Sequence, residues 1–139
     1  MVNTKMSRRC VPYTPSRRPL SEMVIALVSV AGVHLVDQEP FQPDNDTSVR
    51  EIPGDVDSSH LRITHAHYDH DDADRDINLM FPIDRLRELV DMGELGGVAE
   101  KHYGLGYTTN LREMYERVAP SIADAIERSK TDAVLLTAG

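Results

Sequence analysis

Residues 24–30 read VIALVSV, and this aliphatic run is the stretch that decides the fold. A continuous apolar run of this length is typical of a strand that lies inside a parallel sheet and is covered on both faces. Gly32 and His34 follow closely, at the carboxyl end of the expected strand, where open α/β sheets commonly bind their ligands. The stretch therefore predicts a central parallel strand with a site at its end.

The rest of the chain supplies elements that can pack around this strand. Residues 133–137 (AVLLT) form a second buried-strand pattern. Between the two runs, Pro82 opens an amphipathic helix, and Asn110 with Glu113 has the arrangement of a capping box for another helix, which Pro120 interrupts or splits. The strand–helix–strand order predicts an α/β fold: a single open, mostly parallel sheet with flanking helices in a Rossmann-like three-layer arrangement.

Composition divides the chain into two parts. Residues 1–21 are rich in Pro, Ser, Thr and Arg without apolar periodicity, which predicts a flexible basic arm. Residues 22–139 are expected to form one α/β domain. Within it, residues 36–59 contain three prolines and many Asp, Asn and Ser residues, which predicts a long irregular segment.

Charge and cysteine content exclude several classes of function. The net charge of −8 argues against a general nucleic-acid binder, which would present a basic face. The single cysteine, Cys10, rules out an internal disulfide framework and fits a reducing compartment. The apolar run at residues 23–33 is too short to span a membrane, and Glu22 directly before it argues against a signal peptide. We therefore expect a cytoplasmic protein without a membrane or nucleic-acid partner.

The densest group of titratable side chains lies in residues 60–76, which hold four of the six histidines and five aspartates. Such a group is costly to bury unless its members are solvated, paired or bound to a cation. Imidazoles can act as general acids and bases near neutral pH, and a carboxylate beside them can orient a ring or cap a turn. The candidate catalytic residues are His34, His65, His67, His70 and Asp69.

Zinc is one alternative use of this group. Residues 65–70 spell H-x-H-x-D-H, which resembles the metal motif of the metallo-β-lactamase fold and would assign His65, His67, Asp69 and His70 as ligands of a zinc hydrolase. That family needs further His and Asp ligands on later strands, and only His102 follows here. Zinc therefore ranks behind the two alternatives given below.

A resemblance over most of the chain points elsewhere. Residues 31–41 (AGVHLVDQEPF), 50–78 (REIPGDVDSSHLRITHAHYDHDDADRDIN), 81–90 (FPIDRLRELV) and 132–137 (DAVLLT) resemble the selenoprotein B family. This family comprises subunits of glycine, sarcosine and betaine reductases together with the related D-proline reductase subunit. The motifs follow in matching order from about Val24 to Gly139, and several long motifs in register are more specific than one H-x-H-x-D-H.

The resemblance implies a component of an oxidoreductase that reductively cleaves a C–N bond of glycine, sarcosine, betaine or D-proline and forms a disulfide from a dithiol donor. It implies no directly bound cofactor, a pyruvoyl group on a partner subunit, and electron transfer from a selenoprotein A-like carrier or a thioredoxin-like protein. The nucleophile is a selenocysteine or cysteine that follows the strand at residues 133–137. We therefore expect that the chain as given lacks the nucleophile, that Gly139 is followed by selenocysteine whose UGA codon was read as a stop, and that residues 22–139 begin a longer domain.

Under this interpretation, the candidate histidines lie near the nucleophile, where they act as general acids or bases or orient a carboxylate substrate, and Asp69 orients a neighbouring imidazole or caps a turn. These histidines are His34, His65, His67 and His70. Glu39 and Arg85 are candidate substrate-binding residues, Arg85 for a substrate carboxylate. The alternative from a different class is a non-catalytic substrate-binding or assembly subunit, which would need no nucleophile.

Overall fold

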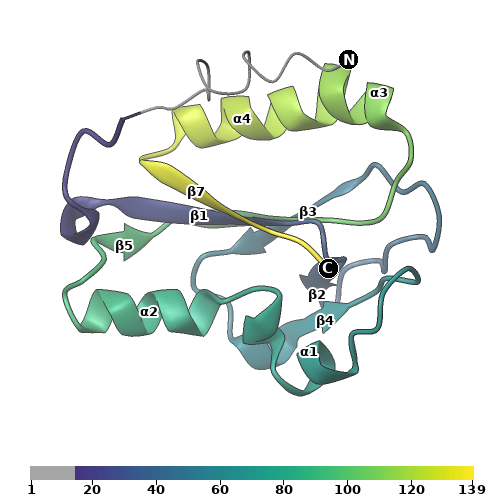
Figure 1. Cartoon of the computed structure of the whole chain (residues 1–139), viewed down its shortest axis with the longest axis horizontal. Coiled ribbons are helices and arrows are strands. Elements are labelled where there is room, and N and C mark those ends of the chain that lie inside the picture. Colours follow the sequence, from purple (N-terminus) through teal and green to yellow (C-terminus); the bar gives the residue numbers. More distant parts are fainter. Residues whose placement is uncertain (1–14) are drawn as a thin grey trace, which may run out of the picture.

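The computed structural model describes residues 15–139, and its main sheet is organised around β1 (Val24–Ser29; Figure 1). β7 (Ala133–Thr137) pairs in parallel with one flank of β1 over residues 25–29. β5 (Gly97–Val98) and β6 (Lys101–Leu105) pair in parallel with the start and the end of the other flank. β3 (Val49–Pro53) pairs antiparallel to β6. The predicted mostly parallel sheet is confirmed.

Helices cover both faces of this sheet (Figure 1). On one face, α2 (Ile83–Asp91) contributes Ile83 and Leu86 to an apolar cluster that contains Leu27 of β1. On the other face, α4 (Ala119–Arg128) belongs to a second apolar cluster that contains Val28. Successive residues of β1 therefore enter two different cores, which explains why the run is apolar throughout instead of alternating. The α/β prediction is confirmed.

The helical segment before β7 changes its pitch near Pro120. α3 (Leu111–Glu113) begins after Asn110, whose side chain accepts a hydrogen bond of 3.2 Å from Glu113 N. A π-helical turn, η4 (Met114–Val118), then leads into α4, with Pro120 in its first turn. Because proline has no N–H and its ring collides with the carbonyl four residues earlier, a local widening of the helix accommodates it.

A second sheet and several short helices complete the fold. β2 (Val33–Leu35) and β4 (Leu61–Ile63) form a two-stranded antiparallel sheet, in addition to the single sheet that we predicted. The segment predicted as irregular contains β3. The aspartate run forms a short helix, α1 (Asp71–Arg75). The remaining turns are the 3₁₀ helices η1 (Leu20–Glu22), η2 (Ser58–His60) and η3 (Ile77–Leu79).

The structure bears in different ways on the predicted amino-terminal arm and on the expected lack of a membrane span. The arm expected at residues 1–21 falls largely on residues 1–14, outside the described residues, and stays a prediction. Within residues 15–139, no helix combines the length and the apolar character that crossing a membrane requires.

His102 is the second residue of β6 and lies close to residues 99–100, which separate β5 from β6. Its fully buried ring accepts a 2.9 Å hydrogen bond at Nδ1 from the backbone N–H of Leu27. Nε2 therefore carries the proton, and it has no hydrogen-bond partner among the described residues. Burial, and secondarily the charge of Arg87, lowers the pKa of His102 to about 4. His102 is thus a neutral part of the core near pH 7, and its ring meets the Phe81 ring edge-on at 5.8 Å.

Candidate functional site

The candidate site lies where β1 and β7 end side by side. Both strands run parallel, so their carboxyl ends meet at the same edge, and Val30 N donates to Thr137 O at 3.0 Å. Residues 64–70, which we call the histidine loop, pack against this edge. Thr64 N donates to Gly32 O and the Tyr68 hydroxyl donates to Ala31 O, each at 2.9 Å. The loop is therefore fixed to the end of β1.

Tyr68 connects the end of β7 with the histidines. A Cβ atom built on Gly139 would lie 2.3 Å from Cε1 of Tyr68, so the backbone of Gly139 packs directly on the tyrosine ring. The same ring lies 4.6 Å from the His65 ring and 5.5 Å from the His70 ring, centroid to centroid. One aromatic ring thus separates Gly139 from two imidazoles.

His67 and His65 are held by a second tyrosine, which our sequence analysis did not select. The Tyr107 ring stacks on His67 with centroids 3.6 Å apart and meets the His65 ring edge-on at 5.8 Å. Nδ1 of His65 accepts the backbone N–H of His67 at 3.1 Å. Burial, followed by the charges of His67 and His70, lowers the pKa of His65 below its usual value. His65 is therefore held in its neutral form, with the proton on Nε2.

Asp44 provides the carboxylate partner of His67. Its Oδ1 lies 2.9 Å from Nε2 of His67. The segment that carries Asp44 is tied to the end of β6, because Asn45 Oδ1 accepts from Thr109 N and Asp46 N donates to Tyr107 O, each at 2.9 Å. Asp44 is thus anchored to the segment that supplies the stacking tyrosine, 23 residues before the histidine it contacts.

His70 has its own carboxylate, which comes from α1. Nδ1 of His70 lies 2.9 Å from Oδ2 of Asp74, one helical turn further along. Asp69, which we expected either to orient an imidazole or to cap a turn, accepts the backbone N–H of Asp71 at 3.1 Å and so caps the turn into α1. Among the described residues, the carboxylates that contact imidazoles of the histidine loop are therefore Asp44 and Asp74.

His34 is buried, and both of its ring nitrogens are engaged. Nδ1 lies 2.7 Å from Leu35 O, which requires the nitrogen to donate, and Nε2 lies 2.9 Å from the hydroxyl oxygen of Thr64. This arrangement supports a positioning role, because His34 fixes the first residue of the histidine loop. The catalytic role that we predicted for it remains a prediction.

Glu39 and Arg85, the predicted substrate-binding residues, lie apart from the histidine loop. Arg85 is exposed on α2 and pairs with Glu88 at 2.9 Å. Glu39 is exposed, and its backbone carbonyl accepts from Arg50 at 2.9 Å. The structure shows no hydrogen bond or ion pair between either side chain and residues 64–70.

The geometry gives no support to the zinc alternative. Within residues 15–139, no three His, Cys, Asp or Glu side chains are grouped so that they could hold a metal ion. His67 and His70 are directed to Asp44 and Asp74, while Asp69 binds the backbone. The H-x-H-x-D-H spacing therefore does not bring its four side chains together.

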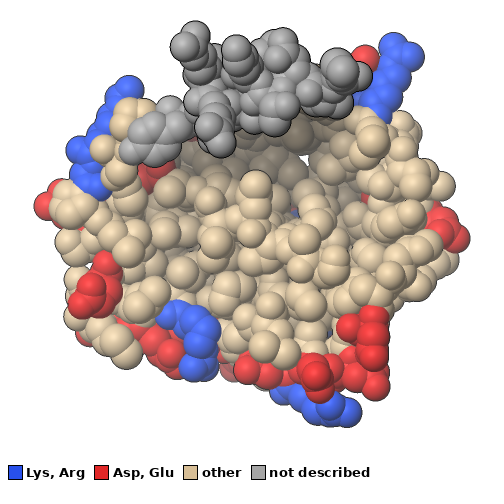
Figure 2. All heavy atoms as spheres, viewed as in Figure 1, with Lys and Arg blue, Asp and Glu red and all other residues tan. Residues whose placement is uncertain are grey.

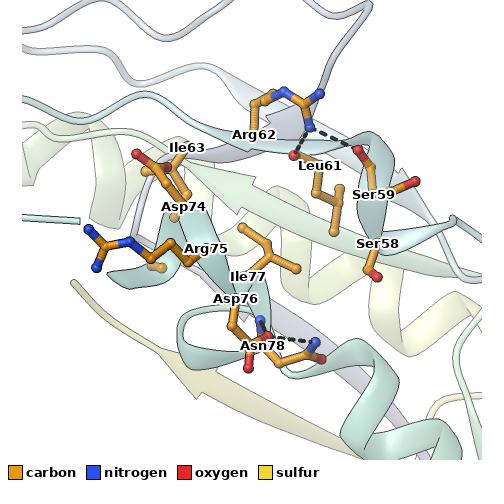
Figure 3. A pocket seen from close by; sticks show the side chains of 11 residues that line it. Ser58, Ser59, Leu61, Arg62, Ile63, Asp74, Arg75, Asp76, Ile77 and Asn78 are labelled. Atoms are coloured by element: carbon orange, nitrogen blue, oxygen red, sulfur yellow. Dashed lines mark hydrogen bonds between the residues drawn. The ribbon is translucent and has the colours of Figure 1, made fainter. Parts of the chain in front are cut away.

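An open cavity of about 590 Å³ adjoins the histidine loop through Asp74, which lines it (Figure 3). Its lining combines apolar side chains, including Leu61 and Ile77, with polar side chains (Figure 3). Arg62 in this lining donates to the carbonyls of Ser59 and Leu61 at 2.8 and 2.6 Å. The guanidinium is thus already engaged by backbone, and we assign no ligand to this cavity.

The fold and the site define a class: an α/β domain whose histidines gather at the carboxyl edge of a mostly parallel sheet. The family model described as Glycine/sarcosine/betaine reductase selenoprotein B (GRDB) matches residues 4–139, and the chain belongs to this family. The resemblance predicted from the sequence is confirmed.

Two curated relatives support the family assignment. The chain is 38% identical over 128 residues to "D-proline reductase subunit gamma" of Acetoanaerobium sticklandii, a match that covers 91% of this chain and 53% of the relative. It is 28% identical over 134 residues to "Glycine reductase complex component B subunit gamma" of Carboxydothermus hydrogenoformans, covering 91% of this chain and 30% of the relative. The chain thus spans about half or less of the length of these relatives. The comparison with solved structures gave no significant match.

Proposed function

We propose that this chain forms the histidine-bearing part of a reductase component that cleaves a C–N bond of glycine, sarcosine, betaine or D-proline. The observation that carries the proposal is the contact of Gly139 with Tyr68, which brings the end of β7 to the histidine loop. The family membership and the names of the relatives, both subunits of reductases, support the same assignment. In the overall reaction, a dithiol is oxidised to a disulfide while the C–N bond takes up two electrons and two protons.

We place the reactive selenocysteine or cysteine within a few residues after Gly139, where it supplies a nucleophile for C–N cleavage. The residues present fit such a group. His65 is neutral with its proton on Nε2, and this nitrogen has no hydrogen-bond partner among residues 15–139. An N–H donor beside a selenolate or thiolate stabilises the anion, in the way that a neighbouring cation or a helix amino terminus does. His65 is therefore assigned the role of hydrogen-bond donor.

His67 and His70 are assigned the movement of protons. Each has one ring nitrogen hydrogen-bonded to a carboxylate, which fixes the tautomer and leaves the other nitrogen to accept or give a proton. The amine that leaves on C–N cleavage needs one proton, and a carboxylate-oriented imidazole is a suitable donor.

The coding sequence that follows the Gly139 codon tests where the nucleophile lies. A UGA codon in an open frame, or a cysteine codon, within the next few positions would support the proposal. A frame that continues without either residue would overturn the catalytic assignment and favour the non-catalytic assembly subunit.

Substituting Asp44→Asn in the complete reductase component is expected to lower kcat about tenfold, because the amide cannot stabilise a protonated His67. The KM is expected to stay within about twofold, since the proposal gives Asp44 no contact with substrate. Dithiol-dependent substrate reduction measured across pH gives both constants. Asp72→Asn is the matched control, because this carboxylate pairs with Arg75 instead of an imidazole. Equal losses in the two variants would contradict the role of Asp44.

A further inference from the structure

β7 forms an edge of the main sheet in the part of the chain that the structure describes. Its described sheet pairing is with β1 alone. Three consecutive side chains of β7 are exposed, with fractional exposures of 39% for Val134, 39% for Leu135 and 73% for Leu136. Exposed apolar strands at a sheet edge are sites of pairing with further polypeptide.

No β7 side chain belongs to either of the two apolar clusters that the helices form with β1. Leu136 is the register partner of Val28, whose side chain lies in the α4 cluster, so Leu136 projects toward the α4 side. Leu135 is the partner of Leu27, which lies in the α2 cluster, and therefore projects toward the opposite side. Because exposed apolar side chains lie on both faces, a strand alone would leave them uncovered, and the occupant needs apolar cover on each face.

The β7 edge also lacks the features that protect an edge strand from pairing. Natural edges carry Lys, Pro or inward-pointing charges, whereas β7 reads AVLLT. Figure 2 views the molecule from the side on which β7 lies in front, and the middle of this face shows no Lys, Arg, Asp or Glu side chain. The charged residues visible in this view lie around the rim. The surface is therefore suited to an apolar partner.

We propose that β7 binds a further β-strand, flanked by helices, from the part of the reductase component that lies outside the match to this chain. The D-proline reductase relative contains about as much polypeptide outside the match as within it, since the match covers 53% of its length. Such an α/β segment supplies both the strand and the apolar cover. A second copy of this chain fits less well, because it would bring together two molecules of net charge −8. The inference rests on the family and not on the proposed chemistry.

Hydrogen–deuterium exchange tests the proposal directly. The probe is the portion of the Acetoanaerobium sticklandii subunit outside the 128-residue match, co-expressed with this chain as a separate polypeptide. We expect it to co-purify, and we expect the β7 amides to exchange at least about tenfold more slowly than in this chain alone. Unchanged exchange at β7, whether or not the two polypeptides associate, would overturn the proposal.

A pair of lysine substitutions adds a second measurement. Leu136→Lys places a charge on the β7 edge, while Leu111→Lys places one on α3 at a position of equal exposure, 73%. We expect Leu136→Lys to weaken binding of the probe at least about tenfold and Leu111→Lys to leave it within about twofold. Equal effects of the two variants, or a dimer of this chain alone that Leu136→Lys dissociates, would overturn the proposal. Neither readout requires catalytic activity, so failure here is distinguishable from failure of the proposed reaction.

Discussion

Replacing Gly32 by alanine is expected to destabilise the protein by at least about 3 kcal/mol. Gly32 has a φ of +77°, in the left-handed region, where a Cβ atom costs about 1–2 kcal/mol. A Cβ atom there would also lie 2.3 Å from the carbonyl oxygen of Thr64 and 3.2 Å from Cβ of His65. The histidine loop must move away, or β1 must shift, and either change breaks the hydrogen bond from Thr64 N to Gly32 O.

Gly93 provides the matched control for this substitution. Its φ is +76°, nearly the same, but a Cβ atom built there would meet no atom within 4 Å. Gly93→Ala is therefore expected to cost only about 1 kcal/mol, the penalty of the backbone conformation itself. Denaturant unfolding followed by circular dichroism gives both free energies. Similar losses for the two variants would show that the loop does not press on Gly32.

The free energy of unfolding is expected to fall by about 3 kcal/mol between pH 6.5 and pH 4 because of His102. Its pKa is lowered from 6.5 to about 4 in the folded protein. Below pH 6.5 the unfolded chain binds a proton at this residue, whereas the folded protein does not bind it until about pH 4. The unfolded state thus binds more protons in this window, so stability is present above pH 6.5 and is lost as the pH falls.

His102→Asn tests this assignment, because the asparagine side-chain oxygen can accept the Leu27 N–H in place of Nδ1 and does not titrate. Unfolding free energies measured from pH 7.5 to pH 4 should show a shallower slope in this variant than in the wild type. His60→Asn, at an exposed histidine, is the control and should keep the wild-type slope. An unchanged slope in His102→Asn would mean that other groups cause the acid sensitivity.

The elements that could be predicted from the sequence are those with an uninterrupted local pattern. β1, β7 and α2 each carry an apolar run or a helical repeat that identifies them without reference to the rest of the chain. β6 has no such pattern, because its five residues read KHYGL and mix charged, polar and small side chains. Its strand conformation depends on pairing with β1 and β3, which are distant in the sequence. Tertiary pairing, not local preference, decides such a strand.

The same distinction applies to the candidate site. The histidine loop was found because its titratable residues are neighbours in sequence. Asp44 and Tyr107 belong to segments distant from the loop, and no local spacing connects them with His67. Asp74 lies four residues after His70, a signal that would have required recognising α1 as a helix. His34 and His102 have the same chemistry as the loop histidines, and their burial alone separates them.

The parallel pairing of β1 has a consequence for the synthesis of the protein. β1 leaves the ribosome well before β7, which pairs with one of its flanks, because 108 residues separate Val24 from Asp132, directly before β7. At ordinary rates of translation, this interval amounts to roughly 5 to 20 s. During that time the nascent chain presents VIALVS without its β7 neighbour, and exposed apolar strands promote aggregation. We therefore expect the nascent chain to depend on a chaperone until β7 has been made.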